Sequence, residues 1–144
     1  MTDTGTYLIP TAQLSLQAAE NLLARSLAGA REAGFPVAVA VVDSGGALRA
    51  FARSDDAPFL TAQVAMDKAW TAASFGFSTA EWNDYMANPR VAPLANTPRM
   101  MPVAGGIALR RHGQIIGAIG ISGGSYTQDD ELARSAIAAL GLAE

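Results

Sequence analysis

The segment from Val103 to Leu140 constrains the fold more than any other part of the chain. It reads VAGGIALRRHGQIIGAIGISGGSYTQDDELARSAIAAL. Between Gly113 and Gly124, glycines are interspersed with isoleucines, a pattern that indicates a buried strand to which other backbone lies close. A tight turn at His112-Gly113 precedes this strand, and a Gly123-Gly124 corner leads from it into a helix. The segment therefore predicts a β-hairpin followed by the last helix.

Hydrophobic spacing predicts the other elements. Apolar positions recur at helical spacing over residues 14–33 and again over 59–74. Residues 37–43 and 47–53 alternate as strands do and are rich in apolar side chains. A Ser78-Thr79-Ala80-Glu81 capping box opens a short third helix. The predicted order of elements is therefore α-β-β-α-α-β-β-α.

This order predicts the fold class. Two hairpins favour antiparallel pairing, and strands that are apolar on both faces need cover on both faces. We therefore expect an α+β fold, a central antiparallel sheet flanked by helices. The chain of 144 residues suits one domain, which we place at residues 14–144, with residues 1–13 as an N-terminal arm.

Residues typical of helix ends mark the predicted boundaries. Ser15 or Thr11 is available to cap the first helix, and Gly34 is placed to end it. Asp55-Asp56 followed by Pro58 favour the start of the second helix, since acidic residues and an early proline both suit a helix N-terminus.

Composition excludes several classes of function. The formal net charge is −3 and the basic residues are scattered, which argues against nucleic-acid binding. No apolar run is long enough to cross a membrane, and the start of the chain lacks the pattern of a signal peptide, so we expect a cytoplasmic protein without a membrane partner. The absence of cysteine excludes disulfides and thiolate metal sites. Hydrophobic residues make up 50% and charged residues 16%, which indicates a homo-oligomer.

The glycine corner has two interpretations. Gly123 and Gly124 could present backbone N–H groups to a carboxylate or phosphate, or they could form a turn that needs a positive φ. The corner lacks the lysine and the spacing of a P-loop. Gly105-Gly106 begin the preceding strand directly after a proline-rich loop over residues 89–102, which we expect to be a lid or a subunit contact.

Two charged positions are candidates for chemistry. Lys68 and its neighbour Asp67 are isolated charges in an apolar helix, so Lys68 either faces solvent or is desolvated and acts as a base or a charge clamp. Asp43 ends an apolar strand before a Gly-Gly turn. It either caps that turn or pairs with Arg53 or Lys68 across the hairpin mouth.

The remaining polar residues favour structural roles. His112 is the single histidine and falls at a turn, which argues against a serine-protease type triad and against a multi-histidine metal site, so we predict no metal. Asp129, Asp130 and Glu131 follow one another and do not share one helix face. Together with Thr127 they predict the solvated start of the last helix.

A flat aromatic ligand would suit another group of side chains. Met66, Met100 and Met101 are polarizable and apolar, and Trp70 and Tyr85 add aromatic rings. The same side chains could instead pack in a core or in a subunit interface.

The order and spacing of several segments resemble the GlcG/HbpS family over residues 14–142. The segments are DSGGALRAFARSDDAP, AMDKAWTAASFG, PVAGGIALRRHGQIIGAIGISGG and QDDELA. The resemblance implies a profilin-like antiparallel sheet flanked by helices and compact homo-oligomers, often octamers. Members of this family are associated with heme, with corrinoid-utilisation loci as the C-terminal part of PduO-type proteins, and with glycolate or aromatic catabolism. Relatives that ligate heme through histidine place it near the first helix, which holds none here.

Two functions follow as hypotheses. The resemblance implies a small-ligand-binding protein that holds heme or a related tetrapyrrole in an oligomer pocket. The residues expected at that pocket are Lys68, Arg53, Met100, Met101, Gly105, Gly106, Gly123 and Gly124. The alternative is a cofactor-independent isomerase, hydratase or lyase acting on a small organic acid. In it, Arg53 or Lys68 clamps the carboxylate and Asp43 or Lys68 moves the proton.

Overall fold

The computed structural model describes residues 5–144, and Met1–Thr4 of the predicted arm lie outside the described residues. Its elements follow the order α-β-β-α-α-β-β-α with one added 3₁₀ helix, so the predicted α+β class is confirmed. Their bounds are α1 Leu16–Ala33, β1 Ala38–Asp43, β2 Leu48–Arg53, α2 Leu60–Phe75, α3 Thr79–Tyr85, η1 Ala92–Asn96, β3 Gly106–Arg111, β4 Gln114–Ser122 and α4 Tyr126–Ala139.

The four strands form one antiparallel sheet in the order β2-β1-β4-β3. The two hairpins meet through β1 and β4, where Ala40 lies opposite Gly120 and Asp43 opposite Gly117. Close packing explains the glycines of β4. A Cβ at Gly120 would lie 2.1 Å from the carbonyl oxygen of Ala65 on α2. The glycine pattern thus lets α2 lie directly on the sheet.

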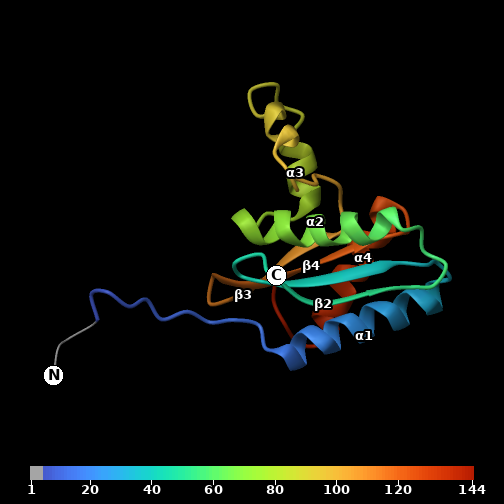
Figure 1. Ribbon diagram of the computed structural model, residues 1–144, viewed down its shortest axis with the longest axis horizontal. Coiled ribbons are helices and arrows are strands. Elements are labelled where there is room, and N and C mark those ends of the chain that lie inside the picture. The colour runs from blue at the N-terminus through green and yellow to red at the C-terminus, as the bar shows by residue number, and fades with distance from the viewer. Residues whose placement is uncertain (1–4) are drawn as a thin grey trace.

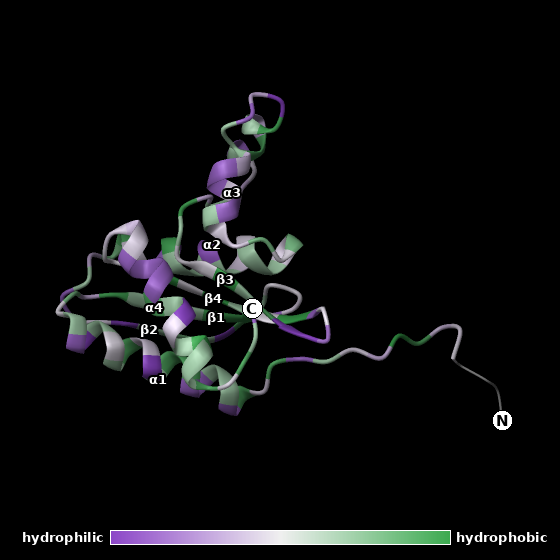
Figure 2. Cartoon of the chain, turned by 180° about the vertical axis from the view of Figure 1, so that it is seen from behind, coloured by the Kyte–Doolittle hydropathy of each residue, from purple (hydrophilic) through white to green (hydrophobic). Residues whose placement is uncertain are grey.

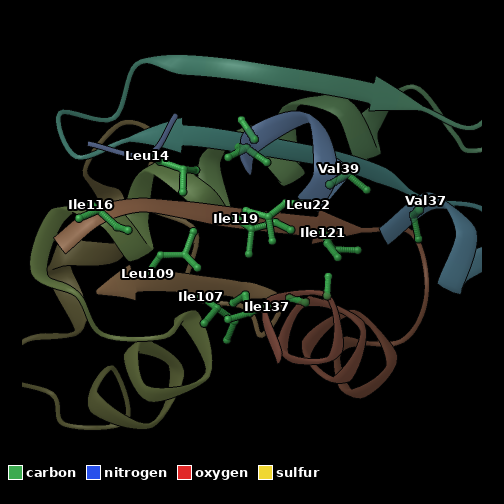
Figure 3. Close-up of a cluster of buried hydrophobic side chains, with 14 of the residues drawn as sticks. Leu14, Leu22, Val37, Val39, Ile107, Leu109, Ile116, Ile119, Ile121 and Ile137 are labelled. Atoms are coloured by element: carbon green, nitrogen blue, oxygen red, sulfur yellow. The ribbon is translucent and has the colours of Figure 1, made fainter. Parts of the chain in front are cut away.

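Helices cover both faces of the sheet (Figure 1). On one face, α1 and α4 enclose a core of branched aliphatic side chains (Figure 3). It is built around Leu14, Leu22, Val37, Val39, Ile107, Leu109, Ile116, Ile119, Ile121 and Ile137. On the other face, α2 packs alanines against the alanines of the strands, including Ala65 and Ala69 against Ala40. Small side chains on both surfaces explain how closely this helix approaches the strands.

Local signals set most helix ends. Ser15 accepts a hydrogen bond from the N–H of Ala18 and caps α1, and Gly34 ends that helix with φ of 83°. The helix α2 begins at Leu60, one residue after the predicted spacing starts, but the predicted acidic cap is wrong, because Phe59 is the N-cap and no side chain caps the helix.

The start of α4 also differs from the prediction. Ser125 caps α4 through a capping box with Gln128, two residues before the predicted Thr127. Because Ser125 provides a hydroxyl at the N-cap and Gln128 lies three residues on, the helix starts earlier.

Two segments project from the layered body. The segment carrying α3 and η1 stands away from the sheet, and the N-terminal arm runs in another direction (Figures 1 and 2). Within residues 5–144, no helix is both long and apolar enough to cross a membrane.

Candidate functional site

Lys68 and Asp129 form a buried ion pair beside the glycine corner. The Nζ atom of Lys68 lies 3.1 Å from Oδ2 of Asp129 and donates a 2.8 Å hydrogen bond to the carbonyl oxygen of Ile121. Lys68 and Asp129 are each only 2% exposed. The other carboxylate oxygen, Oδ1, accepts a 2.9 Å hydrogen bond from the N–H of Gly124. The prediction that Asp129 is solvated is therefore wrong, since its carboxylate compensates a buried ammonium.

Glycines make room for this pair. A Cβ at Gly105, where φ is 127°, would lie 2.8 Å from Lys68 Nζ and 2.5 Å from the Ile121 carbonyl oxygen. A Cβ at Gly106 would lie 2.5 Å from the backbone oxygen of Lys68. The structure thus brings Lys68, Gly105, Gly106, Gly123 and Gly124 together, so these five predicted site residues are neighbours.

Burial acts on both charged groups. It lowers the pKa of the Lys68 ammonium, and the attraction of Asp129 opposes that change. It raises the pKa of the Asp129 carboxyl, and the Lys68 charge and the N–H of Gly124 oppose it. Two of the three donor hydrogens of Lys68 serve Ile121 and Asp129. These hydrogen bonds hold α2, β4 and α4 together.

The loop with Met100 and Met101 is bound to α2 by polar contacts. The hydroxyl of Thr71 donates to the carbonyl of Arg99 at 3.1 Å and accepts from the N–H of Met101 at 2.9 Å. The guanidinium of Arg99 bonds Asp67 at 3.2 Å and lies 5.0 Å from the ring centroid of Trp70. Both methionines are half-buried beside α2.

Asp43 and Arg53 lie at opposite ends of the first hairpin. The Asp43 carboxylate accepts hydrogen bonds from the N–H groups of Gly45 and Ala47 at 2.9 and 3.0 Å and so caps its own turn. Arg53 pairs with Ala38 at the far end of the strands. Of the two interpretations of Asp43, the structure shows the cap of its own turn, and the alternative pairing with Arg53 or Lys68 is wrong. Arg53 instead lines a hollow of about 590 Å³ together with Arg31.

Gly123 serves the same carboxylate as Gly124, since its N–H also hydrogen-bonds Asp129, and it makes a second contact of its own. Its φ is 147°, and a Cβ there would lie 2.2 Å from the carbonyl oxygen of Pro36. The corner therefore makes a turn that glycine adopts without strain, and it lies directly against the segment that enters β1.

An aromatic hollow lies where α2 passes into α3. Gly76 ends α2 in the left-handed conformation, with φ of 79°, and so sets Phe75 and Phe77 side by side, their ring centroids 6.1 Å apart. The hydroxyl of Ser78 caps α3, which carries Trp82 and Tyr85 three residues apart on one face. The centroid of Trp82 lies 5.5 Å from each phenylalanine and 6.0 Å from Tyr85.

This hollow has apolar walls and an acidic rim. Its volume is about 730 Å³, and Leu94, Glu81 and Asp84 complete its lining. Phe75 is 68% exposed, whereas Trp82 is buried at the base of the cluster. The indole N–H of Trp82 has no hydrogen-bond partner among the described residues. An exposed aromatic surface of this kind is typical of a ligand or partner site.

Of the residues that line this hollow, only Tyr85 is predicted from the sequence as a ligand contact. Phe75, Phe77 and Trp82 are not predicted as part of a site. The signal was the spacing Phe-x-Phe-x₄-Trp-x₂-Tyr across a helix end, which becomes one cluster only through the turn at Gly76. Across residues 5–144, no three histidine or acidic side chains gather as metal ligands.

Comparisons with known proteins match nearly the whole chain. A family model described as "Haem degrading protein HbpS-like" matches residues 14–138. The corrinoid adenosyltransferase PduO of Citrobacter freundii is 34% identical over 137 residues, which cover 92% of this chain and 41% of PduO. The chain therefore spans about two fifths of that relative. Protein GlcG of Escherichia coli K12 is 35% identical over 109 residues, 76% of this chain and 81% of GlcG.

Solved structures share the fold. A double mutant of HbpS from Streptomyces reticuli superposes with a TM-score of 0.90 at 30% identity, covering 98% of this chain and 96% of that one. A complex of PduOC with heme superposes with a TM-score of 0.84 at 32% identity, covering 92% of this chain and 98% of that one. The family match extends over most of the sequence and its members share the sheet described above. The chain therefore belongs to the HbpS-like family.

Proposed function

We propose that the protein binds heme or a related tetrapyrrole on the aromatic hollow between α2 and α3. The observation that carries the proposal is the exposed wall of Phe75, Phe77 and Tyr85 around Trp82. Flat apolar ligands bind such surfaces through stacking and burial of apolar area. The similarity to the heme complex of PduOC supports the choice of ligand class.

The apolar and aromatic lining fits the ring of a tetrapyrrole, whose propionates would have to point away from Glu81 and Asp84 on the rim. The volume of about 730 Å³ falls within the range of roughly 300–1,000 Å³ typical of ligand pockets. The Tyr85 hydroxyl is a lining group of a type that ligates heme iron, and the unpartnered N–H of Trp82 is a donor in the same cluster. When bound, heme would supply an iron centre for redox or gas-ligand chemistry. The histidine His112 lies at the β3–β4 turn, outside the lining.

The placement between Lys68, the Met100-Met101 loop and the glycine corner stays a second prediction. The Lys68 ammonium is buried against the Asp129 carboxylate and the Ile121 carbonyl. A ligand that binds Lys68 would therefore have to displace the Lys68–Asp129 ion pair. Breaking one side of a buried ion pair is costly. The aromatic hollow requires no such displacement.

A hemin titration followed by the Soret absorbance tests both placements. We expect Phe75→Asp to weaken binding at least tenfold, because it puts a charge on the apolar wall. Phe59→Asp is the matched control, since Phe59 is 85% exposed at the start of α2 and outside the hollow. Tyr85→Phe should retain binding and change the spectrum. No saturable Soret shift in the parent, or equal binding by the two aspartate variants, would overturn the proposal, and loss on Met100→Ala would favour the other placement.

A small organic acid is the second candidate ligand. Arg31 and Arg53 line one hollow, and neither guanidinium forms an ion pair with another described residue. Two guanidinium groups suit a carboxylate. Lys68 and Asp43 lie away from this hollow, so acid–base chemistry there would fall to Asp55 or Asp56, which also line it.

A thermal-shift screen with small carboxylic acids tests this candidate. An acid that binds should raise the melting temperature of the parent and not of Arg53→Met. Arg111→Met, also exposed at a strand end, is the control and should behave as the parent. If no acid stabilises the parent, the candidate fails.

We also propose that the protein works as a homo-oligomer. Exposed apolar side chains are numerous for a chain with so few charges. They include Tyr7, Leu8, Ile9, Phe59, Leu60, Phe75 and Tyr126. Association of copies would cover such surface. Sedimentation of the parent measures the mass directly.

A further inference from the structure

The edge of the sheet formed by β2 is open. β2 pairs with β1 on one side, and on its other side no strand of residues 5–144 pairs with it. Leu48 and Phe51 on this strand are 49% and 37% exposed. An open edge with apolar side chains is a template for another strand.

The opposite edge, formed by β3, is covered. The N–H of Arg110 donates to the carbonyl of Ala143 at 2.9 Å, and the N–H of Gly106 donates to the Thr79 hydroxyl at 2.8 Å. The C-terminal segment and α3 thus occupy the edge of β3. The contrast between the edges singles out β2 as the free one.

The N-terminal arm has the properties of a missing strand. Tyr7, Leu8 and Ile9 are 81%, 65% and 86% exposed, and residues 5–13 contain no charged side chain. Aromatic and β-branched residues favour strands, and Pro10 is compatible with an edge strand when its nitrogen faces solvent. At about 3.3 Å per residue, residues 5–12 would span about 26 Å, enough for the roughly 20 Å of the six-residue β2.

The root of the arm is fixed beside the start of β2 of its own chain. The amide of Gln13 donates to the Ser44 hydroxyl at 2.5 Å and accepts from the Ser44 N–H at 3.1 Å, and Arg49 donates to the carbonyl of Leu14 at 3.4 Å. From this root the arm runs away from the sheet (Figure 1). It therefore points away from its own β2 and toward the surroundings of the molecule.

We propose that the arm of one copy pairs as an added strand with the open edge of β2 in a second copy. The pairing satisfies backbone groups of the edge and covers Tyr7, Leu8 and Ile9 as well as Leu48 and Phe51. In a two-fold dimer each copy gives one arm and receives one. The inference rests on the homo-oligomer proposed above and names its interface, and it is independent of heme.

Because the chain has no cysteine, introduced cysteines report on this contact without background. We would combine Leu8→Cys with Leu48→Cys, Phe51→Cys or Arg53→Cys in the full chain, oxidise the oligomer, and separate the products on a denaturing non-reducing gel. A disulfide requires Cα atoms within about 7 Å. We expect a covalent link between copies from at least one edge cysteine. Leu8→Cys with Phe59→Cys is the control and should give none.

Each other outcome overturns the pairing. A link within one chain would show that the arm folds back on its own β2. A covalent link between copies of the single variant Phe51→Cys, without Leu8→Cys, would show that the β2 edges of two copies meet directly. An oligomer that gives no link at any edge position would show that another surface holds the copies together. If the parent is a monomer in sedimentation, the homo-oligomer proposal itself fails. Failure of the arm pairing and failure of the homo-oligomer are therefore distinguished.

A charge on the arm gives an independent measurement. Leu8→Asp should lower the mass of the oligomer in sedimentation, whereas Phe59→Asp, an equal change at another exposed apolar residue, should leave it unchanged. Equal masses for Leu8→Asp and the parent would contradict the proposal.

Discussion

The ammonium of Lys68 on α2 lies 3.1 Å from the carboxylate of Asp129 on α4, so a single ion pair joins the helices of the two faces of the sheet. It passes beside Gly105, where a side chain would lie 2.8 Å from the ammonium. The Ile121 carbonyl and the Gly124 N–H complete its hydrogen bonds. Gly105 therefore leaves room for this pair, and Gly124 of the glycine corner holds its carboxylate.

Replacing one partner of the pair should strongly destabilise the fold. We expect Lys68→Met to lower the free energy of unfolding by about 3–5 kcal/mol, because it leaves the Asp129 charge buried without compensation. Lys68→Met with Asp129→Asn should recover much of that loss, since the charge is gone and the side chain still accepts from Gly124. Urea unfolding of both variants measures the difference. Additive losses in the double variant would contradict the coupling.

The stability of Lys68→Met should depend on pH in a defined direction. Asp129 keeps its burial but loses the attraction of Lys68, so its pKa in the folded variant rises further above the unfolded value of 3.8. Between these two pKa values the folded state binds a proton that the unfolded chain does not, so stability falls as the pH rises through that window. The deficit relative to the parent should therefore shrink as the pH is lowered from about 7 toward about 4. The variant that also carries Asp129→Asn is the control, and a deficit independent of pH in Lys68→Met would refute this account.

Gly123→Val should cost several kcal/mol. The backbone has φ of 147°, and the new Cβ would lie 2.2 Å from the Pro36 carbonyl oxygen, so strain and a backbone clash add. Gly113→Val is the matched control, because Gly113 has φ of 78° but nothing within 4 Å of the added Cβ. It should lose only the roughly 1–3 kcal/mol of backbone strain. Equal melting temperatures for the two variants would show that contact with Pro36 has no part.

Tryptophan fluorescence should report ligand binding. Of the two tryptophans, Trp82 belongs to the aromatic hollow, whereas Trp70 lies 5.0 Å from the Arg99 guanidinium, on α2. Hemin bound at the hollow should quench Trp82 and therefore quench the fluorescence of Trp70→Phe nearly completely. Titration of that variant with hemin is the measurement. Persistent emission at saturation would place the ligand elsewhere.

Thr71→Val should release the loop that carries Met100 and Met101. The buried hydroxyl serves the Arg99 carbonyl and the Met101 N–H, and leaving such groups unsatisfied costs about 1–3 kcal/mol. Faster amide hydrogen exchange around Met101 should accompany the loss. Thr97→Val, an exposed threonine of the same segment, is the control and should exchange as the parent does.

Local sequence signals determined the elements of this protein. Alternation and helical spacing predicted the order of helices and strands, since each pattern depends on neighbours in the chain. Ser15, Gly34 and Ser78 fixed helix ends through bonds to residues at most four positions away. The glycines of β4 predicted that another part of the backbone lies close to this strand, and α2 is the element that does so at Gly120. The start of α4 was mispredicted because Ser125 and Thr127 are both able to cap a helix, and the acidic cap predicted for α2 does not form.

Only the tertiary structure decided how the charges and rings combine. Lys68 and Asp129 are 61 positions apart, and no local pattern states that a helix on one face reaches a helix on the other. Asp43 and Arg53 are close in sequence, yet the antiparallel register places them at opposite ends of the hairpin. The turn at Gly76 gathers four rings into one hollow. Secondary structure follows from short-range patterns, whereas a site depends on contacts between distant residues that form only when the layers pack.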